Sequence, residues 1–195
     1  MAAPLKVSYK IHQGGTFKEV LRRESSLKGY APITGITKAA PMVVTSVGHG
    51  IPVGWRTKIT NVSGMKEINS TDVYHTITSS TTDTVTINAV NSLGYTEYTS
   101  GGVLEYNVPV SLAGITARMQ IRGKLEDDVP LLTLTTENGG IVIDDVLKTI
   151  TIVITATQTS EMSFSSAVYS MELIDGTEVT PFIYGGLTLE REITR

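Results

Sequence analysis

The sequence predicts an all-β protein with at most one short helix, and three observations support this prediction. Short segments of alternating apolar and polar residues recur along the chain, and this period of two places every second side chain on one face of a sheet. Threonine and valine outnumber alanine and leucine, a balance typical of strands. Glycine, present at 18 positions, joins proline and asparagine in separating these segments with turns.

The N-terminal segment shows the alternation clearly. Apolar residues at the odd positions of Leu5–Ile11 predict a strand. Gln13–Gly15 supplies a turn, after which Thr16–Arg22 is predicted to return as the second strand of a hairpin. A short helix over Thr16–Arg22 is the alternative.

The chain changes character from Ala31 onward. Five short β-type segments follow one another, at Met42–Val47, Thr57–Val62, Val73–Thr78, Thr84–Ala89 and Gly102–Tyr106. Strands this short and this evenly spaced favour a small barrel or sandwich. The turns between them are rich in glycine, proline and asparagine, which leaves no room for a long helix.

The remaining chain is predicted to build the principal sheet. Its β-branched segments are Gly114–Arg122, Leu131–Thr135, Ile141–Ile143 and Thr149–Ile154. Thr155–Ser163 is the place for the one short helix, because Thr155 can cap it. Ala167–Ile174 and Glu178–Glu190 are predicted to form a hairpin that turns at Asp175-Gly176.

Size and charge limit the possible functions. A chain of 195 residues with 41% hydrophobic content can bury one core or two small ones. The 16 basic and 19 acidic residues are spread along the chain, so no basic surface is expected for direct nucleic-acid binding. Cysteine is absent, which excludes disulfides and thiolate chemistry. No segment has about 18 consecutive apolar residues, and no signal-peptide core is evident, so we expect a protein made in the cytoplasm without a membrane span.

Residues with chemical potential do not converge in the sequence. His12, His49 and His75 lie in different contexts, and His49 is interpreted as a turn residue whose ring bonds a backbone carbonyl, with a metal ligand or base as the alternative. Glu126–Asp128 and Asp144-Asp145 are interpreted as solvated loops, with a calcium site near Asp144 as the alternative. We therefore predict no catalytic, cofactor-binding or metal-binding residues, and no enzyme activity. The glycine pairs Gly14-Gly15, Gly139-Gly140 and Gly185-Gly186 are interpreted as turns or bulges rather than phosphate cradles.

Aromatic residues give the only candidate binding surface. Trp55, Tyr95 and Tyr98 lie in the same central region, and aromatic rings on a β-module can stack on sugars or anchor an interface. Packing in a core is the alternative, and it is favoured for Trp55.

The central region also resembles a known module. The pattern includes His49-Gly50, Gly54, Val62–Met65, Ile68-Asn69 and Tyr74, and it ends in Gly94–Gly102 with Tyr95 and Tyr98. In these features Ile33–Gly102 resembles the small β-barrel module of phage tail proteins that is similar to the FCCH domain of ubiquitin-activating enzymes. The resemblance implies a barrel over residues 32–107.

The flanking segments resemble a different family. Tyr9–Phe17 and Leu112–Arg122, followed by Leu132–Gly140, Ile150–Gln158, Tyr169–Leu173 and Gly185–Arg195, are similar to N-terminal domains of phage upper baseplate proteins. The resemblance implies one β-sandwich, made of residues 1–31 and 108–195, which the barrel interrupts. Ala31-Pro32 and Asn107–Pro109 are the expected hinges. The chain departs from the family at Glu24–Tyr30, where a polar run replaces a Trp-containing strand.

Together the resemblances imply a non-enzymatic structural or accessory protein of a tailed bacteriophage virion, in the tail, baseplate, neck or capsid decoration. Its expected partners are other phage structural proteins and copies of itself in a homo-oligomer, with Thr149–Ile154 and Gly186–Ile193 as candidate pairing edges. A module that binds a host-surface glycan or receptor is the alternative. A polysaccharide-degrading enzyme is disfavoured, because the chain is short and has no groove-forming repeat.

Overall fold

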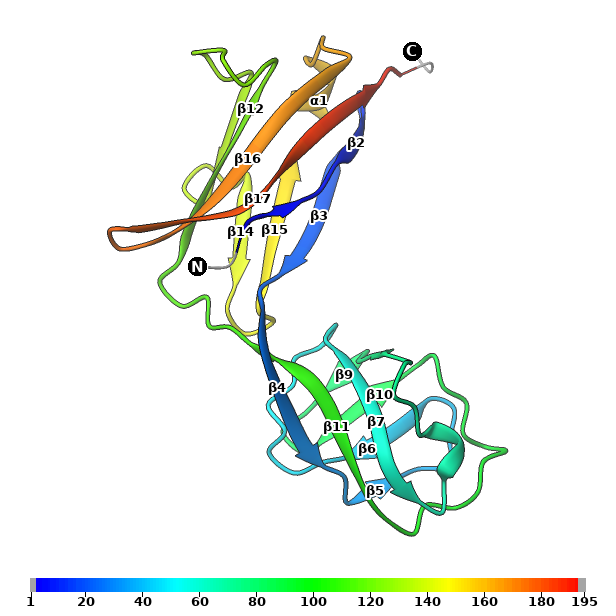
Figure 1. Cartoon of the computed structure of the whole chain (residues 1–195). Helices are drawn as coiled ribbons and strands as arrows, with labels where there is room; N and C mark the ends of the chain where they lie inside the picture. The colour runs from blue at the N-terminus through cyan, green and yellow to red at the C-terminus, as the bar shows by residue number, and fades with distance from the viewer. Residues whose placement is uncertain (1–2, 193–195) are drawn as a thin grey trace. The chain divides into compact units, whose positions relative to one another are not determined.

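The computed structural model describes residues 3–192 and confirms the all-β prediction (Figure 1). The chain forms two compact units, each with its own hydrophobic core. The sandwich unit comprises the chain up to Arg22, Ser111–Asp145 and the chain from Thr149. The barrel unit comprises Arg23–Val110, together with Val146–Lys148.

Two sheets form the sandwich unit. The first sheet has the order β1 (Leu5–Lys6), β17 (Glu178–Glu190), β16 (Ser166–Asp175), β12 (Thr116–Arg122) and β13 (Leu132–Thr135), and β2 (Tyr9–His12) also pairs with β17. The second sheet has the order β14 (Ile141–Asp144), β15 (Thr149–Ile154) and β3 (Phe17–Arg22).

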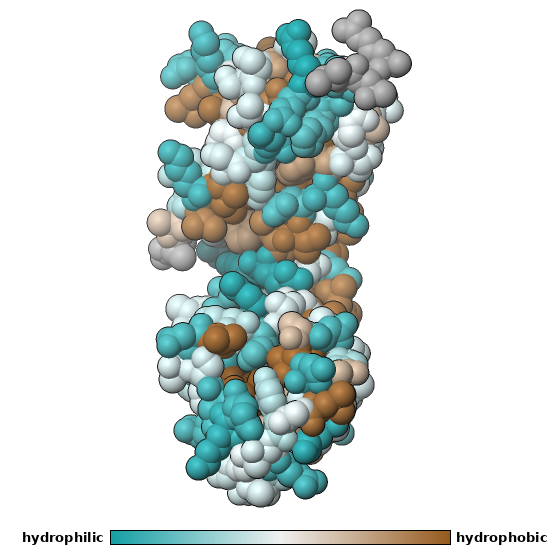
Figure 2. Space-filling model, turned by 90° about the vertical axis from the view of Figure 1, so that its right-hand side faces the viewer, coloured by the Kyte–Doolittle hydropathy of each residue, from teal (hydrophilic) through white to brown (hydrophobic). Residues whose placement is uncertain are grey.

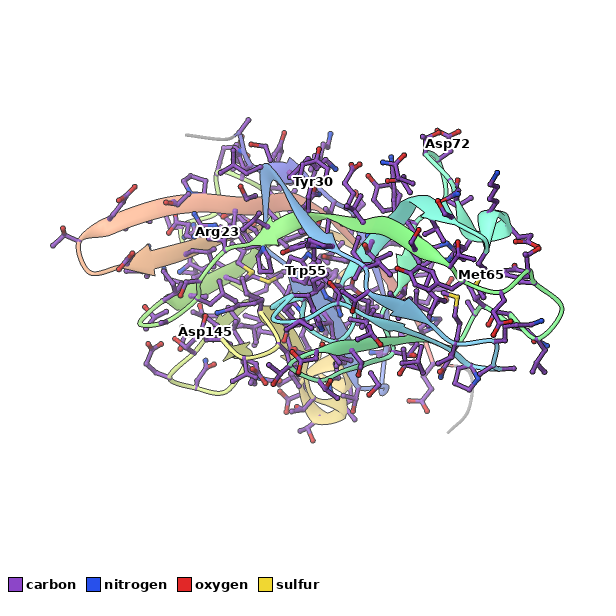
Figure 3. The ribbon with its side chains drawn as sticks, turned by 90° about the horizontal axis from the view of Figure 1, so that it is seen from below. Arg23, Tyr30, Trp55, Met65, Asp72 and Asp145 are labelled. Atoms are coloured by element: carbon purple, nitrogen blue, oxygen red, sulfur yellow. The ribbon has the colours of Figure 1, made fainter. Side chains whose placement is uncertain are left out.

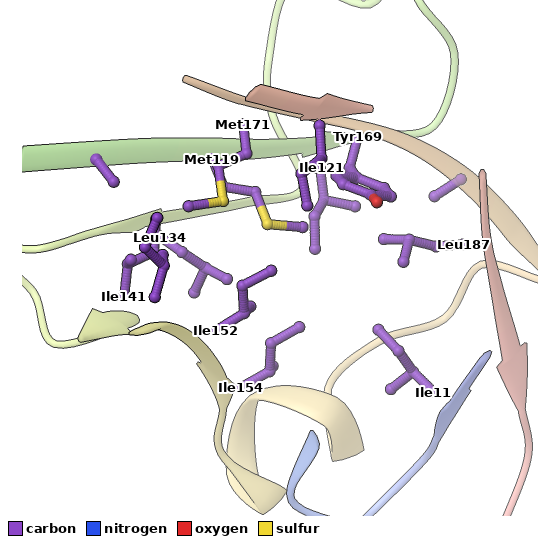
Figure 4. Close-up of a cluster of buried hydrophobic side chains, with 14 of the residues drawn as sticks. Ile11, Met119, Ile121, Leu134, Ile141, Ile152, Ile154, Tyr169, Met171 and Leu187 are labelled. Atoms are coloured by element: carbon purple, nitrogen blue, oxygen red, sulfur yellow. The ribbon is translucent and has the colours of Figure 1, made fainter. Parts of the chain in front are cut away.

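Alternating residues of both sheets fill the space between them. Leu134, Met119 and Met171 lie in one row across β13, β12 and β16, and all three are buried. Ile152 and Ile154 of β15 face them from the second sheet, as Figure 4 shows. The period of two seen in the sequence therefore describes the core side of each strand.

Two local predictions in this unit are confirmed. Strands β16 and β17 form the predicted hairpin. Asp175 pairs with Glu178, so the two turn residues are Gly176-Thr177, one position later than predicted, and Gly176 has the positive φ that such a tight turn needs. The helix is α1 (Ala156–Ser160), and Thr155 caps it. The Thr155 hydroxyl accepts from the backbone N–H of Gln158, while the Gln158 side chain accepts from the backbone N–H of Thr155.

The predicted N-terminal hairpin is wrong. The segment Leu5–Ile11 is not one strand, since Val7-Ser8 separates β1 from β2. Strand β2 runs parallel to β17, whereas β3 runs antiparallel to β15 in the other sheet. The turn after Gln13 thus carries the chain from one sheet of the sandwich to the other.

The barrel unit has two four-stranded sheets that join at two corners. One sheet has the order β5 (Gly35–Ile36), β6 (Met42–Thr45), β10 (Thr84–Ile87) and β9 (Ser79–Ser80). The other has the order β4 (Glu24–Pro32), β11 (Ser100–Pro109), β7 (Arg56–Ser63) and β8 (His75–Thr76), with the 3-10 helix η1 (Lys66–Ile68) after β7.

Backbone hydrogen bonds close this barrel at both corners. The chain runs from β4 into β5, and Ile33 donates to Gly102 while Thr34 donates to Thr45 in the other sheet. It also runs from β8 into β9, where Ile77 donates to Trp55 and Thr78 donates to Thr86. Strands of one sheet thus continue into the other, as in a closed barrel.

The boundary between the units differs from the expected one. Strand β4 pairs with β11 from Glu24 to Pro32, so it belongs to the barrel. Ala31-Pro32 and Asn107–Pro109 lie inside paired strands and are not hinges. The barrel instead begins at Arg23 and ends at Val110, where the Val110 N–H donates to the Arg23 carbonyl at 3.2 Å. The polar run Glu24–Tyr30 is explained by this pairing, because it forms a barrel strand instead of a strand of the sandwich.

No helix within residues 3–192 combines the length and the apolar character that crossing a membrane requires.

Candidate interaction surfaces

The three aromatic residues predicted to bind ligands at the surface are interior or half-buried. Trp55 is 0% exposed, and its indole N–H donates to the backbone carbonyl of Asn107 at 2.7 Å. Tyr95 and Tyr98 are half-buried and pack against the barrel core, and the Tyr98 hydroxyl donates to the Ile33 carbonyl. For Trp55 the structure confirms the favoured alternative, packing in a core, because its ring lies inside the barrel (Figure 3).

Other aromatic residues occupy the outer face of the barrel. Tyr30 of β4 is 63% exposed and lies in register with Glu105 of β11 and Lys58 of β7, on the side away from the core. Figure 3 shows Tyr30 on the outside of the barrel and Trp55 within it. Just before β8, Val73 and Tyr74 are also exposed. We call the surface formed by Lys28, Tyr30, Arg56, Lys58, Val73 and Tyr74 the tyrosine face.

Cations surround one ring of the tyrosine face. The Lys58 Nζ atom lies 4.7 Å from the centre of the Tyr74 ring, and Lys28 Nζ and Arg56 Cζ each lie 5.8 Å from it. These distances are typical of cation–π contacts. Lys28 also donates to the Tyr74 hydroxyl at 3.4 Å. The ring therefore gathers three positive side chains from β4 and β7.

Two carboxylates balance this charge in part. Glu105 lies 3.5 Å from Lys28, and Glu24 lies 3.6 Å from Arg56 while accepting from the Asn107 side chain. Both carboxylates are more buried than the cations that they contact. The tyrosine face thus presents cations together with tyrosine rings, and aromatic residues are enriched at protein interfaces.

The sandwich unit carries a surface of opposite character in the loop between β12 and β13. Leu125 is 80% exposed and Val129 is 77% exposed, and Leu131 is also exposed. The acidic residues Glu126 and Asp128 are exposed between them. Apolar side chains that are exposed close together mark a binding surface more often than apolar side chains that are exposed singly. On the face that Figure 2 draws, apolar patches likewise interrupt the polar surface.

Hydrogen bonds hold this loop in shape. The Asp127 carboxylate accepts from the backbone N–H of Lys124 at 2.8 Å, and the Arg122 guanidinium donates to the Asp127 carbonyl. The Leu131 N–H donates to the Ile121 carbonyl at 2.7 Å and closes the loop. The exposed apolar side chains are therefore presented by an ordered loop.

A hollow of about 290 Å³ lies beside this loop. Leu131, Leu132, Met162 and Phe164 form apolar walls, and Gln158 and Glu161 add polar groups. Gly123 and Leu131, at the two ends of the loop, both line the hollow. We call the loop Gly123–Leu131 together with this hollow the acidic end.

The histidines do not converge on a site. His49 is buried, its Nδ1 accepts from the Ile51 N–H at 2.9 Å, and its Nε2 faces the Thr84 carbonyl at 3.4 Å. This confirms its interpretation as a turn residue, and the two bonds assign the proton to Nε2. Burial lowers the pKa of His75. His12 contacts Glu190, with 3.0 Å between Nδ1 and Oε2.

The acidic pairs have structural contacts. The Asp145 carboxylate accepts from the backbone N–H of Leu112 at 2.5 Å. Within residues 3–192, no group of three or more His, Asp or Glu side chains is placed to hold a metal ion.

Two of the glycine pairs serve turns, as interpreted, whereas Gly185-Gly186 lies inside the paired strand β17 and not in a turn or bulge. Gly14 and Gly139 adopt positive φ in turns. Gly185 lies against the backbone of Val7, where a Cβ atom would not fit.

The predicted pairing edges are wrong. Strand β15, which contains Thr149–Ile154, has β14 on one side and β3 on the other. Strand β17 lies between β16 and the N-terminal strands β1 and β2, and the predicted limit at Ile193 falls outside the described residues. Among the described strands of the sandwich, the edges are β13 and the N-terminal strands β1 and β2 in the first sheet, and β14 and β3 in the second.

Comparison of the sequence with known protein families and with curated proteins gives no match.

Proposed function

We propose that this chain is a non-enzymatic structural or accessory protein of a tailed bacteriophage virion, in the tail, baseplate, neck or capsid decoration. It binds copies of itself and other virion proteins through its β-rich surfaces. The observation that carries the proposal is the interrupted sandwich, in which strands from before and after the barrel share one core. The resemblance to phage upper baseplate domains with an inserted barrel leads to the same organisation.

The surfaces of both units support a role in assembly. Leu125 and Val129 expose apolar side chains on an ordered loop, and the tyrosine face exposes Tyr30 and carries cations around the Tyr74 ring. Ordering such side chains before binding lowers the entropic cost of association. Extended contacts between proteins use features of this kind.

A glycan- or receptor-binding module is the second candidate, and Tyr30 is the observation that favours it. Its ring is exposed enough to stack on a sugar, unlike Trp55. A glycan array probed with the full chain and with Tyr30→Ala separates the two candidates. Binding that depends on Tyr30 favours this second candidate.

Two measurements test the proposed function. Mass spectrometry and a density map of intact particles, from the phage whose genome encodes the chain, should place it at several copies per particle. Light scattering on the purified chain should give a mass above the 21.0 kDa of one copy, or a complex when other virion proteins are added. A strictly monomeric chain that is absent from particles and binds no virion protein refutes the proposal.

A further inference from the structure

We propose that copies of this chain associate head to tail, with the tyrosine face of one copy bound to the acidic end of the next. The inference rests on the proposed self-association and names the two surfaces that produce it. The partner of each surface is thus a second copy of this chain.

Charge complementarity is the first reason. On the tyrosine face, Lys58 contacts the Tyr74 ring, whereas the two neighbouring carboxylates are already paired with Lys28 and Arg56. On the acidic end, Glu126 and Asp128 are exposed. Opposite charges on facing surfaces steer association and fix its register.

Apolar complementarity is the second reason. Tyr30 protrudes from a sheet face, while the acidic end offers a hollow walled by Leu131, Met162 and Phe164. Tyrosine is enriched among the residues that contribute most of the binding energy of an interface. Such residues typically fill a well-packed pocket on the partner. A buried tyrosine also needs a partner for its hydroxyl, and Glu161 lines the hollow as an acceptor.

The third reason is that both surfaces are held in place before they bind. Pairing with β11 fixes the backbone at Tyr30, and contacts with Lys28, Arg56 and Lys58 surround Tyr74. The contacts of Asp127 fix the loop of the acidic end. Neither surface has to order itself on binding, so more of the contact energy appears as affinity.

The two surfaces differ, so the contact is heterologous. A heterologous contact repeated from copy to copy builds a ring when the rotation closes and a filament when it does not. A twofold dimer built from one self-complementary patch is therefore not the expected product.

Two variants of the full chain test the inference. The face variant combines Tyr30→Ala with Lys58→Ala, and the end variant combines Glu126→Lys with Asp128→Lys. Asp127 is left unchanged because it holds the loop. Lys66→Ala in η1 and Glu178→Lys at the start of β17 are the matched controls, as both residues are exposed charges outside the two surfaces. Emission from Trp55 and circular dichroism report that each variant is folded.

Sedimentation gives the expected results. Each double variant alone should weaken self-association at least about tenfold, and the controls should not change it. An equimolar mixture of the two double variants should form a one-to-one complex that grows no further, because it retains one intact face and one intact end.

Other outcomes overturn the inference. Continued self-association of either double variant refutes the head-to-tail contact while leaving the proposed function intact. A face variant that still self-associates but no longer binds a glycan or another virion protein also refutes the head-to-tail contact. A wild-type chain that is monomeric and absent from particles refutes the proposed function as well, so the two failures are distinguishable.

Discussion

Substitution of Gly185 tests the close packing of the Val7 backbone against β17. A Cβ atom at Gly185 would lie 1.8 Å from the Val7 carbonyl oxygen and 2.7 Å from its carbonyl carbon. The backbone at Val7 would have to move away, and Val7 is tied there by two hydrogen bonds. Its N–H donates to the Tyr184 carbonyl at 2.9 Å, and its carbonyl accepts from the Tyr169 hydroxyl at 2.9 Å.

The cost of Gly185→Ala follows from these contacts. Each lost hydrogen bond costs about 1 kcal/mol, and overpacking adds about 1–3 kcal/mol. We therefore expect the free energy of unfolding to fall by about 3–5 kcal/mol. Gly186→Ala is the matched control, because its Cβ would meet nothing closer than the Ser8 hydroxyl at 3.7 Å. That change should be neutral or stabilise by about 0.5 kcal/mol, since alanine is favoured over glycine in a strand.

Urea denaturation followed by circular dichroism measures both variants. Trp55 is the only tryptophan and lies in the barrel, so its emission reports that unit separately. Gly185→Ala should lower the transition that circular dichroism assigns to the sandwich, and faster hydrogen exchange at the Val7 amide should accompany it. Equal stability of the Gly185→Ala and Gly186→Ala proteins would refute the close packing of the Val7 backbone against Gly185 of β17.

Three further predictions concern the cap, a phenol and the barrel core. Thr155→Ala should lower the free energy of unfolding by about 1 kcal/mol in urea titrations, because it removes the capping box, whereas Thr157→Ala in the same helix should change it little. Burial, and next the proximity of Tyr9, raise the pKa of Tyr169 above its usual 10.0. The unfolded phenol then ionises first, so stability should fall as the pH rises above 10.0, and Tyr169→Phe should flatten that fall in denaturation series at increasing pH. Trp55→Phe should cost about 2 kcal/mol, measured by circular dichroism, since it leaves a cavity and an unpaired carbonyl in the barrel.

Local signals predicted the parts of the fold that depend on neighbouring residues. Gly176 favours a tight turn by its own backbone freedom, and Thr155 caps the helix that follows it. The helix cap formed at the predicted residue, and the hairpin turn formed one residue after the predicted position. Their determinants lie within a few residues, so no distant contact is needed to define them.

The pairing partners of several strands could not be predicted, because they lie far away in the sequence. Strand β2 has its partner in β17, about the whole length of the chain away, and nothing near Gln13 indicates it. The same holds for β4, whose polar residues gain their place by pairing with β11. Edge and interior strands look alike in sequence, because the number of neighbours is a property of the sheet.

The candidate binding residues show the same limit. The sequence identified aromatic residue types, but the side of the sheet on which each ring lies depends on register. Trp55 falls inside the barrel and Tyr30 outside it. Lys28 and Tyr30 are two residues apart in β4, so their side chains lie on the same face of the strand. This spacing could have indicated an exposed face, once the segment had been recognised as a strand.

The junction between the units explains how one chain can present two unlike surfaces. Arg23 and Val110 are joined by a backbone hydrogen bond at the point where the barrel begins and ends. An inserted unit of this kind requires only that its ends lie close together, so each core can form from its own residues. Exposed residues of the tyrosine face can consequently change without disturbing the core behind the acidic end. Separate cores thus allow the two surfaces to be matched to each other by substitution while the fold of each unit is retained.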